Sequence, residues 1–147
     1  MNITTRQGTR DDIPAVFELV KELALYEKAL DQIANTPDRM AQDYDDKLYD
    51  FFVAEADGNI IGLSLYYFRY STWKGKRLYM EDIIVTESMR GNGIGKLLFD
   101  ATVQAARDTN CTGMMWQVLN WNVSAVGFYR KYGTRFDDEW VNCNLDF

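Results

Sequence analysis

One glycine-rich segment constrains the fold of this 147-residue chain more than any other part of its sequence. Residues 90–96 read Arg-Gly-Asn-Gly-Ile-Gly-Lys, directly after a strand-like apolar run and before a run with helical spacing. The free N–H groups and the dipole at the start of a helix favour an anion there. The order of strand, glycine loop and helix therefore predicts a phosphate-binding turn, with a parallel pair of strands around it.

Two common nucleotide-binding loops do not match this segment. A Walker P-loop has four residues between its glycines and Ser or Thr after its lysine, whereas Leu97 follows Lys96 here. The dinucleotide fingerprint G-x-G-x-x-G would require glycine at position 96. Both nucleotide-binding interpretations are therefore weak, and the alternative to a phosphate-binding loop is a merely flexible turn.

The rest of the chain predicts a single α+β domain over residues 1–147. Strand-like runs lie at 2–8, 49–56, 60–70, 77–86, 112–119 and 140–146. Helical patterns lie between them, and the expected helix caps are Asp11 or Asp12 for the first helix and Asn122 for the last. The turn Asp57-Gly58-Asn59 is typical of a hairpin. The pattern favours a mixed, mostly antiparallel sheet with flanking helices.

Charge and composition exclude several classes of function. The chain has 16 Lys+Arg against 22 Asp+Glu, a net charge of −6, whereas a nucleic-acid binder normally carries a basic surface. There is no histidine. Imidazole acid–base chemistry, Ser-His and Cys-His pairs and His-ligated zinc are therefore excluded. Proton transfer has to use Glu, Asp, Tyr, Lys, Cys, the chain termini or water.

The acidic side chains are concentrated in the first part of the chain. Residues 1–60 hold 13 acidic and 6 basic side chains, whereas residues 61–147 hold 9 and 10. Such an excess is either a solvated surface that aids solubility or a site for a cation.

The two cysteines and the hydropathy pattern indicate the setting in which the chain works. Cys111 and Cys143 lack CxxC spacing, which predicts neither a disulfide framework nor a metal site, and we expect both to be reduced and packed. No run approaches the ~20 apolar residues of a membrane span, and the N-terminus is polar. We expect a cytoplasmic protein without membrane contact.

Two motifs carry a resemblance to a known family. Arg90, Gly93 and Gly95 fit the pattern R/Q-x-x-G-x-G/A, which resembles the acetyl-CoA loop of the GNAT N-acetyltransferases. Further along, N-x-x-A-x-x-F-Y-x-K-x-G from Asn122 to Gly133 resembles the second motif of that superfamily. Four more segments are similar to its diamine (spermidine/spermine) and thialysine acetyltransferase group: residues 22–27, 70–75, 78–83 and 121–122.

The resemblance implies the GNAT fold and an acetyl-CoA-dependent N-acetyltransferase. Its acceptor would be the primary amine of a small, cationic substrate, it would need no metal, and it would be a homodimer. The implied cofactor contacts are the backbone of Ile83, Ile84 and Val85, the loop residues Arg90, Gly91, Asn92, Gly93, Ile94, Gly95 and Lys96, and Asn122 and Ala125 on the following helix. The physics agrees, because a splayed strand frees N–H and C=O groups for a ligand's amides.

The resemblance also implies two catalytic residues. Glu81 matches a substrate-site glutamate and would accept a proton from the amine, directly or through water. Tyr129 matches the general acid that protonates the departing sulfur. The alternative interpretations are an exposed or ion-paired Glu81 and a core aromatic Tyr129. Asp82, on the opposite face of a regular strand, either supports the site or is structural.

The implied amine contacts are Tyr26, Glu27, Glu81, Met115, Trp116 and Gln117. Carboxylates pair with a cation and aromatic faces attract it, although Met115 also fits a core strand position. Two rival functions stay open. One is the same chemistry on a peptide N-terminus, an amino acid or an aminoglycoside, and the other is a non-catalytic acyl-CoA-binding sensor.

Overall fold

The structure is a computed structural model and describes residues 2–147. These residues form two compact units, one reaching to Trp116 and one running from Gln117 to Phe147. The first unit contains the sheet and helices α1 to α3, and the second contains helix α4.

One five-stranded sheet in the order β1-β2-β3-β4-β5 forms the centre of the first unit. The strands are β1 (Ile3–Gln7), β2 (Asp50–Ala56), β3 (Asn59–Ser71), β4 (Gly75–Val85) and β5 (Met114–Trp116). Strands β1 to β4 are antiparallel neighbours, and β5 runs parallel to β4. The predicted α+β class, the meander and the parallel pair are confirmed. Strand β5, however, is much shorter than the predicted run at 112–119.

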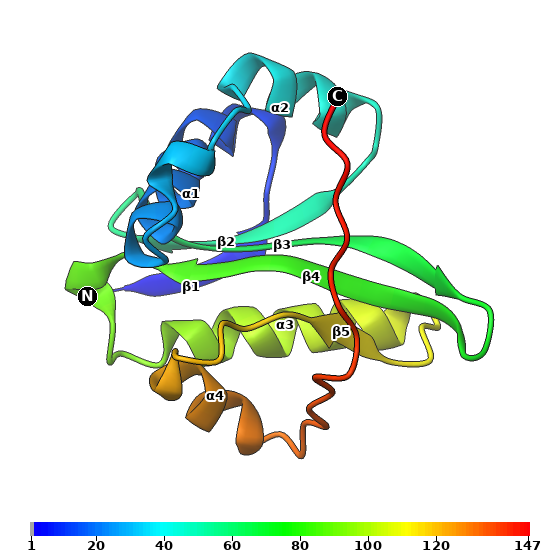
Figure 1. Cartoon of the computed structure of the whole chain (residues 1–147). Helices are drawn as coiled ribbons and strands as arrows, with labels where there is room; N and C mark the ends of the chain where they lie inside the picture. Colours follow the sequence, from blue (N-terminus) through cyan, green and yellow to red (C-terminus); the bar gives the residue numbers. More distant parts are fainter. Residues whose placement is uncertain (1) are drawn as a thin grey trace. The chain divides into compact units, whose positions relative to one another are not determined.

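Helices cover both faces of this sheet. Helices α1 (Ile13–Tyr26) and α2 (Pro37–Asp45) lie on one face, and α3 (Ile94–Asp108) lies on the other (Figure 1). Short 3₁₀ turns occupy Arg10–Asp12, Leu30–Gln32 and Glu87–Met89. On the α1 face the buried core includes Phe17, Phe51 and Leu63. On the α3 face it includes Ile94 and Leu98.

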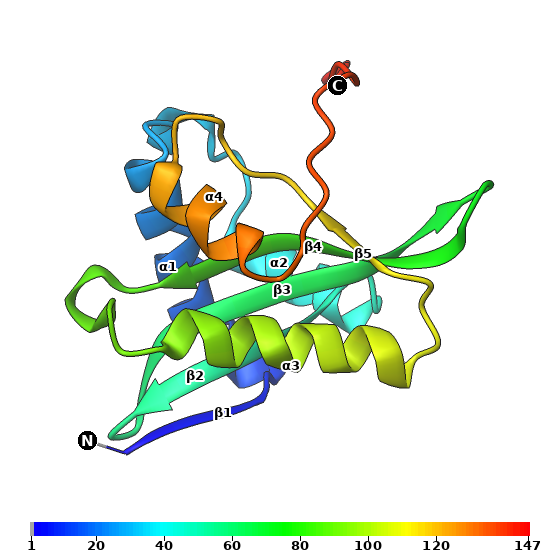
Figure 2. The same ribbon diagram turned by 90° about the horizontal axis from the view of Figure 1, so that it is seen from below.

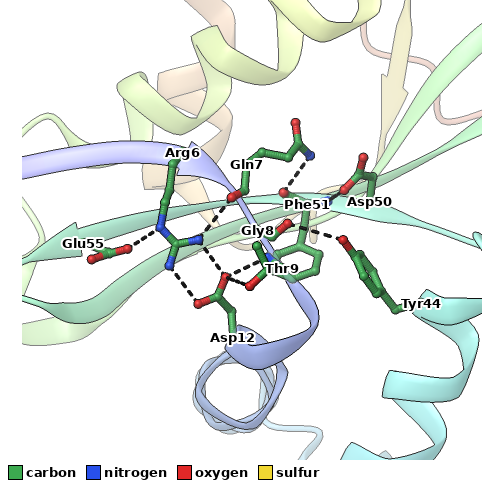
Figure 3. Close-up of polar contacts among 9 residues, drawn as sticks. All are labelled: Arg6, Gln7, Gly8, Thr9, Asp12, Tyr44, Asp50, Phe51 and Glu55. Atoms are coloured by element: carbon green, nitrogen blue, oxygen red, sulfur yellow. Dashed lines mark hydrogen bonds and ion pairs between the residues drawn. The ribbon is translucent and has the colours of Figure 1, made fainter.

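The turn between β1 and α1 is held by a charged network (Figure 3). The carboxylate of Asp12 accepts a hydrogen bond from the Thr9 backbone N–H at 2.7 Å and two from the Arg6 guanidinium at 2.8 Å. Arg6 also pairs with Glu55 on β2. Asp12 therefore closes a capping box on the 3₁₀ turn. It is also the N-cap residue of α1, as predicted, but its side chain forms no capping bond to that helix.

A β-bulge interrupts β4 at Glu81. Leu65 of β3 pairs with Asp82 and Tyr66 pairs with Met80, so Glu81 is the extra residue. Directly opposite residues in an antiparallel pair share a face of the sheet. Because Leu65 belongs to the core on the α1 face, Asp82 lies on that face as well. The expectation that Asp82 lies opposite Glu81 is wrong, because the bulge reverses the alternation.

The second unit contains one helix, α4 (Val123–Arg130). As predicted, Asn122 caps it, since the side-chain oxygen accepts from the Ala125 N–H at 3.3 Å. Gly133 follows the helix with φ of 72°. The predicted strand at 140–146 is wrong, because a strand exists only through a ladder of bonds to a neighbour and these residues form none with residues 2–147.

The side chains of this last segment are exposed. Trp140 is 76% exposed and Val141 is 83% exposed, so successive side chains are both in solvent. Cys143 is exposed too, which corrects the expectation that it is packed, and Cys111 is half-buried. Both cysteines are free, as predicted. Among the described residues, no helix is both long enough and apolar enough to cross a bilayer.

Candidate active site

The glycine loop leaves room for an anion at the start of α3. Gly91 and Gly93 have φ of 82° and 76°, values that favour glycine. A Cβ at either position would meet no atom within 4 Å, so the space beside the loop is open. The N–H of Leu97 bonds to the Gly93 carbonyl at 3.2 Å. By helix geometry the N–H groups before Leu97 are left for another acceptor, as a phosphate would require.

Arg90 joins this loop to the end of α1. Its guanidinium lies 5.0 Å from the centre of the Tyr26 ring, and its Nε donates to the Val85 carbonyl at 3.0 Å. Glu22 lies 4.0 Å from the guanidinium and accepts from the Glu87 N–H at 2.9 Å. The resemblance implies a substrate contact for Tyr26 and a cofactor contact for Arg90, and these two side chains thus contact each other.

Lys96 also has a partner within the protein. It pairs with Asp100 at 2.6 Å, one turn further along α3. Both cations of the loop therefore have a partner within the protein, and the backbone N–H groups at the start of α3 add further donors for a phosphate.

Beside this loop, one edge of β4 has no strand partner. Strand β5 pairs with β4 at Leu78, Tyr79 and Met80 and ends there. Strand β4 continues to Val85, so the edge of Ile83, Ile84 and Val85 that faces away from β3 is unpaired by any strand of residues 2–147. Extended ligands bind such edges through backbone N–H and C=O groups. The predicted cofactor strand therefore has the geometry that its role requires.

Three carboxylates gather where the free edge begins. Burial raises the pKa of Asp82 to about 7, and the charges of Glu81 and Glu27 add to the rise. Burial also raises the pKa of Glu27, at the end of α1. Glu81 itself is exposed. The group can attract a cation and, at Asp82, accept a proton near neutral pH. Among residues 2–147, no three Cys, Asp or Glu side chains are placed to share a metal ion.

Two tyrosines next to these carboxylates were not found from the sequence. Tyr67 and Tyr79 pair across β3 and β4, with ring centres 5.3 Å apart. Burial raises the pKa of both phenols, and the Glu81 charge raises each pKa further. Their rings form an aromatic wall beside an acidic group, which suits an ammonium ion. The available signal was the alternation of Tyr79 with Glu81 along β4, but the sequence alone does not show that Tyr67 of β3 pairs with Tyr79.

The two predicted site residues of β5 lie on opposite faces of the sheet. Met115 pairs with Tyr79, is 40% exposed and contacts Arg69, so it lies on the face of the acidic group. Trp116 packs edge-on against Phe99 of α3, at 5.2 Å between ring centres, on the other face. Because side chains alternate along a strand, only one of the two can lie on the face of the acidic group.

The remaining predicted residues belong to the second unit. Tyr129 lies in the last turn of α4, is 5% exposed and packs against Phe128 with ring centres 5.4 Å apart. Asn122 and Ala125 form the start of the same helix, and Gln117 bonds to Asn142 at 3.1 Å. The structure thus brings Glu81, Glu27, the glycine loop and the β4 edge together in one unit, and Asn122, Ala125 and Tyr129 on one helix in the other.

A match to a protein-family model identifies the family to which the chain belongs. The model of the "Acetyltransferase (GNAT) family" matches residues 16–134, which include the bulge, the glycine loop and α4. The chain belongs to the GNAT acetyltransferase family. It is an enzyme, since its relatives are named as N-acetyltransferases.

Similar GNAT proteins cover most of the chain. A thialysine N-epsilon-acetyltransferase of Bos taurus is 34% identical over 90% of this chain and 84% of its own length. A spermidine/spermine N(1)-acetyltransferase-like protein of Homo sapiens is 33% identical over 87% of this chain but only 20% of its own length. The family and the group predicted from the sequence are confirmed.

Solved structures confirm the GNAT fold. An aminoglycoside acetyltransferase from a soil metagenome superposes with a TM-score of 0.82, over 99% of this chain and 96% of its own. Their sequences are 18% identical, so this likeness concerns the fold alone.

Proposed function

We propose that this GNAT enzyme transfers the acetyl group of acetyl-CoA to the primary amine of a small, cationic acceptor. The observation that carries the proposal is the bulge at Glu81. It places two carboxylates, with Glu27 beside them, on one face of the sheet at the point where the free edge of β4 begins. The acceptor cation and the acyl donor would therefore meet at one place.

The acetyl-CoA contacts follow from the shape of the loop and strand. The pantetheine arm would lie along the free edge of Ile83, Ile84 and Val85. The pyrophosphate would lie at the N–H groups of residues 91–96, where the open space beside Gly91 and Gly93 fits it. Asn122 and Ala125 would complete the site from α4. Arg90 would have a second role besides binding phosphate, because its contacts with Tyr26 and Val85 would hold the loop in place.

Proton transfers at the amine and at the sulfur accompany the acyl transfer. A free amine with a pKa near ~10 is mostly protonated at neutral pH, so a base has to remove one proton before attack. Glu81 and Asp82 would share this proton as a coupled pair, directly or through water. The nitrogen then bonds to the thioester carbon, the carbon–sulfur bond breaks, and the Tyr129 phenol gives its proton to the thiolate. The second proton of the nitrogen then returns to the Tyr129 oxygen through water, which leaves a neutral amide.

The acceptor would lie against the acidic and aromatic residues of the α1 face. Glu27, Glu81 and Asp82 would pair with ammonium groups, and Tyr26, Tyr67 and Tyr79 would offer ring faces. Met115 would line this face, whereas Trp116 would support it through Phe99. One relative is named for acetylation of thialysine, and another is named as a spermidine/spermine N(1)-acetyltransferase-like protein, which fits a cationic acceptor.

The proposal also covers the domain organisation and the oligomeric state of the protein. Both units would form one N-acetyltransferase domain over residues 1–147, since the family match crosses the boundary between them. The exposed apolar side chains of the last segment, among them Trp140 and Leu145, would pack against a second copy in a cytoplasmic homodimer. Sedimentation of the full chain would show two copies, and a monomer at micromolar concentration would contradict this.

Thiol release from acetyl-CoA, followed across a panel of acceptors, tests the proposed function. The panel holds spermidine, thialysine, lysine, an aminoglycoside and a peptide with a free N-terminus. We expect small cationic amines to be acetylated at the highest kcat/KM. Equal, background release with every acceptor, or a preference for the peptide, would contradict the proposal.

A further inference from the structure

A guanidinium group lies on the same face as the acidic group and the two tyrosines. Arg69 of β3 is two residues beyond Tyr67, and its guanidinium carbon lies 5.6 Å from the centre of the Tyr79 ring. Its Nη1 donates to the sulfur of Met115 at 3.1 Å. This part of the hairpin of β3 and β4 projects past the other strands (Figure 2). The face proposed to bind a cationic acceptor thus also carries the positive charge of Arg69.

The guanidinium of Arg69 has donors left for a ligand. It is exposed and forms no ion pair within residues 2–147, and methionine sulfur is only a weak acceptor. Arg77, directly opposite on β4, is different, because it donates to the Met114 carbonyl at 3.2 Å and lies against Gly113. The planar fork of an arginine matches the two oxygens of a carboxylate. Arg69 is therefore placed to receive an anionic group.

The spacing along the strand sets the size of such a ligand. Arg77 lies directly opposite Arg69, and Glu81 is four positions further along β4, which is roughly 13 Å between the Cα atoms of Arg77 and Glu81 at ~3.3 Å per residue. The long side chains of Arg69 and Glu81 narrow this gap. Tyr67 lies between them, since it pairs with Tyr79, which stands between Arg77 and Glu81 along β4. A ligand lying over the tyrosines would have a carboxylate pair at one end and a guanidinium at the other.

We infer that Arg69 binds a carboxylate at the far end of the acceptor and makes the site selective for diamino acids over polyamines. The inference rests on the proposed function. An amino acid with a second amine would place that amine at Glu81 and Asp82 and its carboxylate at Arg69. A polyamine of similar length would instead bring a second ammonium group to the guanidinium, and this repulsion disfavours it.

Two pairs of acceptors that differ only in the carboxylate test the role of Arg69. Lysine is compared with cadaverine, and ornithine with putrescine, by thiol release from acetyl-CoA with the full chain. We expect kcat/KM of the native enzyme to be about tenfold or more higher for each amino acid, the scale of one charge-assisted hydrogen bond. Arg69→Gln should reduce this ratio by about tenfold, through lower activity on the amino acids and unchanged or higher activity on the diamines. Arg69→Lys should restore part of the ratio.

Lys74→Gln is the matched control, since it removes one positive charge from the turn of the same hairpin and should leave the ratio unchanged. An equal loss on lysine and cadaverine in Arg69→Gln would overturn the inference, because Arg69 would then only support Tyr79 and Met115. A native enzyme that prefers cadaverine or spermidine would overturn it too, while the proposed function would stand. Background thiol release with every acceptor would overturn both.

Discussion

Asp82 is the residue whose chemistry the fold changes most. In a regular strand it would point away from Glu81, but the bulge turns it to the same face, where burial and two carboxylates raise its pKa to about 7. The ordinary pKa of an aspartate is ~3.9. The folded protein therefore holds a proton there that the unfolded chain releases at neutral pH.

This proton makes stability depend on pH in a defined direction. Because the folded pKa of Asp82 is the higher one, its contribution is fully present below about pH 4 and is lost as pH rises through about 7. Asp82→Asn should therefore raise the free energy of unfolding at pH 8 and change it little at pH 4. Urea unfolding at both pH values measures this. A variant that is equally affected at both would show that the pKa is not raised.

Tyr129 is the second residue whose role can be tested singly. Tyr129→Phe removes only the phenol oxygen and keeps the ring that packs against Phe128. We expect kcat to fall by about 10²–10⁴-fold, the usual contribution of a general acid, with acetyl-CoA binding near normal. Steady-state kinetics and calorimetric binding measure the two quantities. Unchanged turnover would remove the general-acid assignment, and Tyr132→Phe, in the same unit, is the matched control.

At the scale of elements, the sequence predicted the order of strands and helices well. The glycine loop, the hairpin turn and the cap at Asn122 depend on local backbone chemistry, which short motifs record. The bulge at Glu81 was not predictable, because it is a property of how β4 pairs with β3, residues that are far apart in sequence. Tyr67 and Arg69 were missed for the same reason. The predicted strand at 140–146 was wrong because an alternating sequence does not by itself provide a neighbouring strand to pair with.

The glycine loop gives an element-scale prediction about acetyl-CoA. Gly93→Val would place a side chain in the open space at the start of α3 and strain a φ of 76°. We expect the Kd for acetyl-CoA to rise tenfold or more. Gly58→Val is the control, since Gly58 has a φ of 83° and equally open surroundings at the turn between β2 and β3. A similar Kd in both variants would contradict the loop assignment.

The network around Asp12 gives a second prediction, on the stability of the β1–α1 turn. Arg6 holds the pKa of Asp12 below its usual range. The ion pair of Arg6 and Asp12 therefore stabilises the folded protein above about pH 4. This stabilisation is lost as the pH falls through the pKa that Asp12 has in the folded protein. Asp12→Asn should reduce the free energy of unfolding by about 1–3 kcal/mol at pH 7 and less at pH 3. Asp11→Asn, at an exposed neighbour, is the control in thermal unfolding, and equal losses would contradict the role of the pair.

For the whole molecule, the uneven charge predicts how ionic strength affects the reaction. The acidic excess of residues 1–60 includes Glu27 beside the acceptor face, whereas the remainder is nearly neutral. Because salt screens the attraction of exposed charges, KM for a cationic acceptor should rise several-fold between 0.01 M and 0.5 M salt, with kcat nearly constant. Initial rates at the two concentrations measure it. A KM that does not depend on salt would show that the excess serves solubility alone.

The bulge in β4 also has a consequence for how the activity could be lost or transplanted. Removing Glu81 by an in-frame loss of one codon would leave Met80 opposite Tyr66 and Asp82 opposite Leu65, so every core side chain would keep its place. The strand would become regular, and the scaffold would survive while the extra carboxylate disappeared. Scaffold and acceptor chemistry are thus encoded separately at this position, and a graft of the site onto another GNAT backbone has to carry the inserted residue with it.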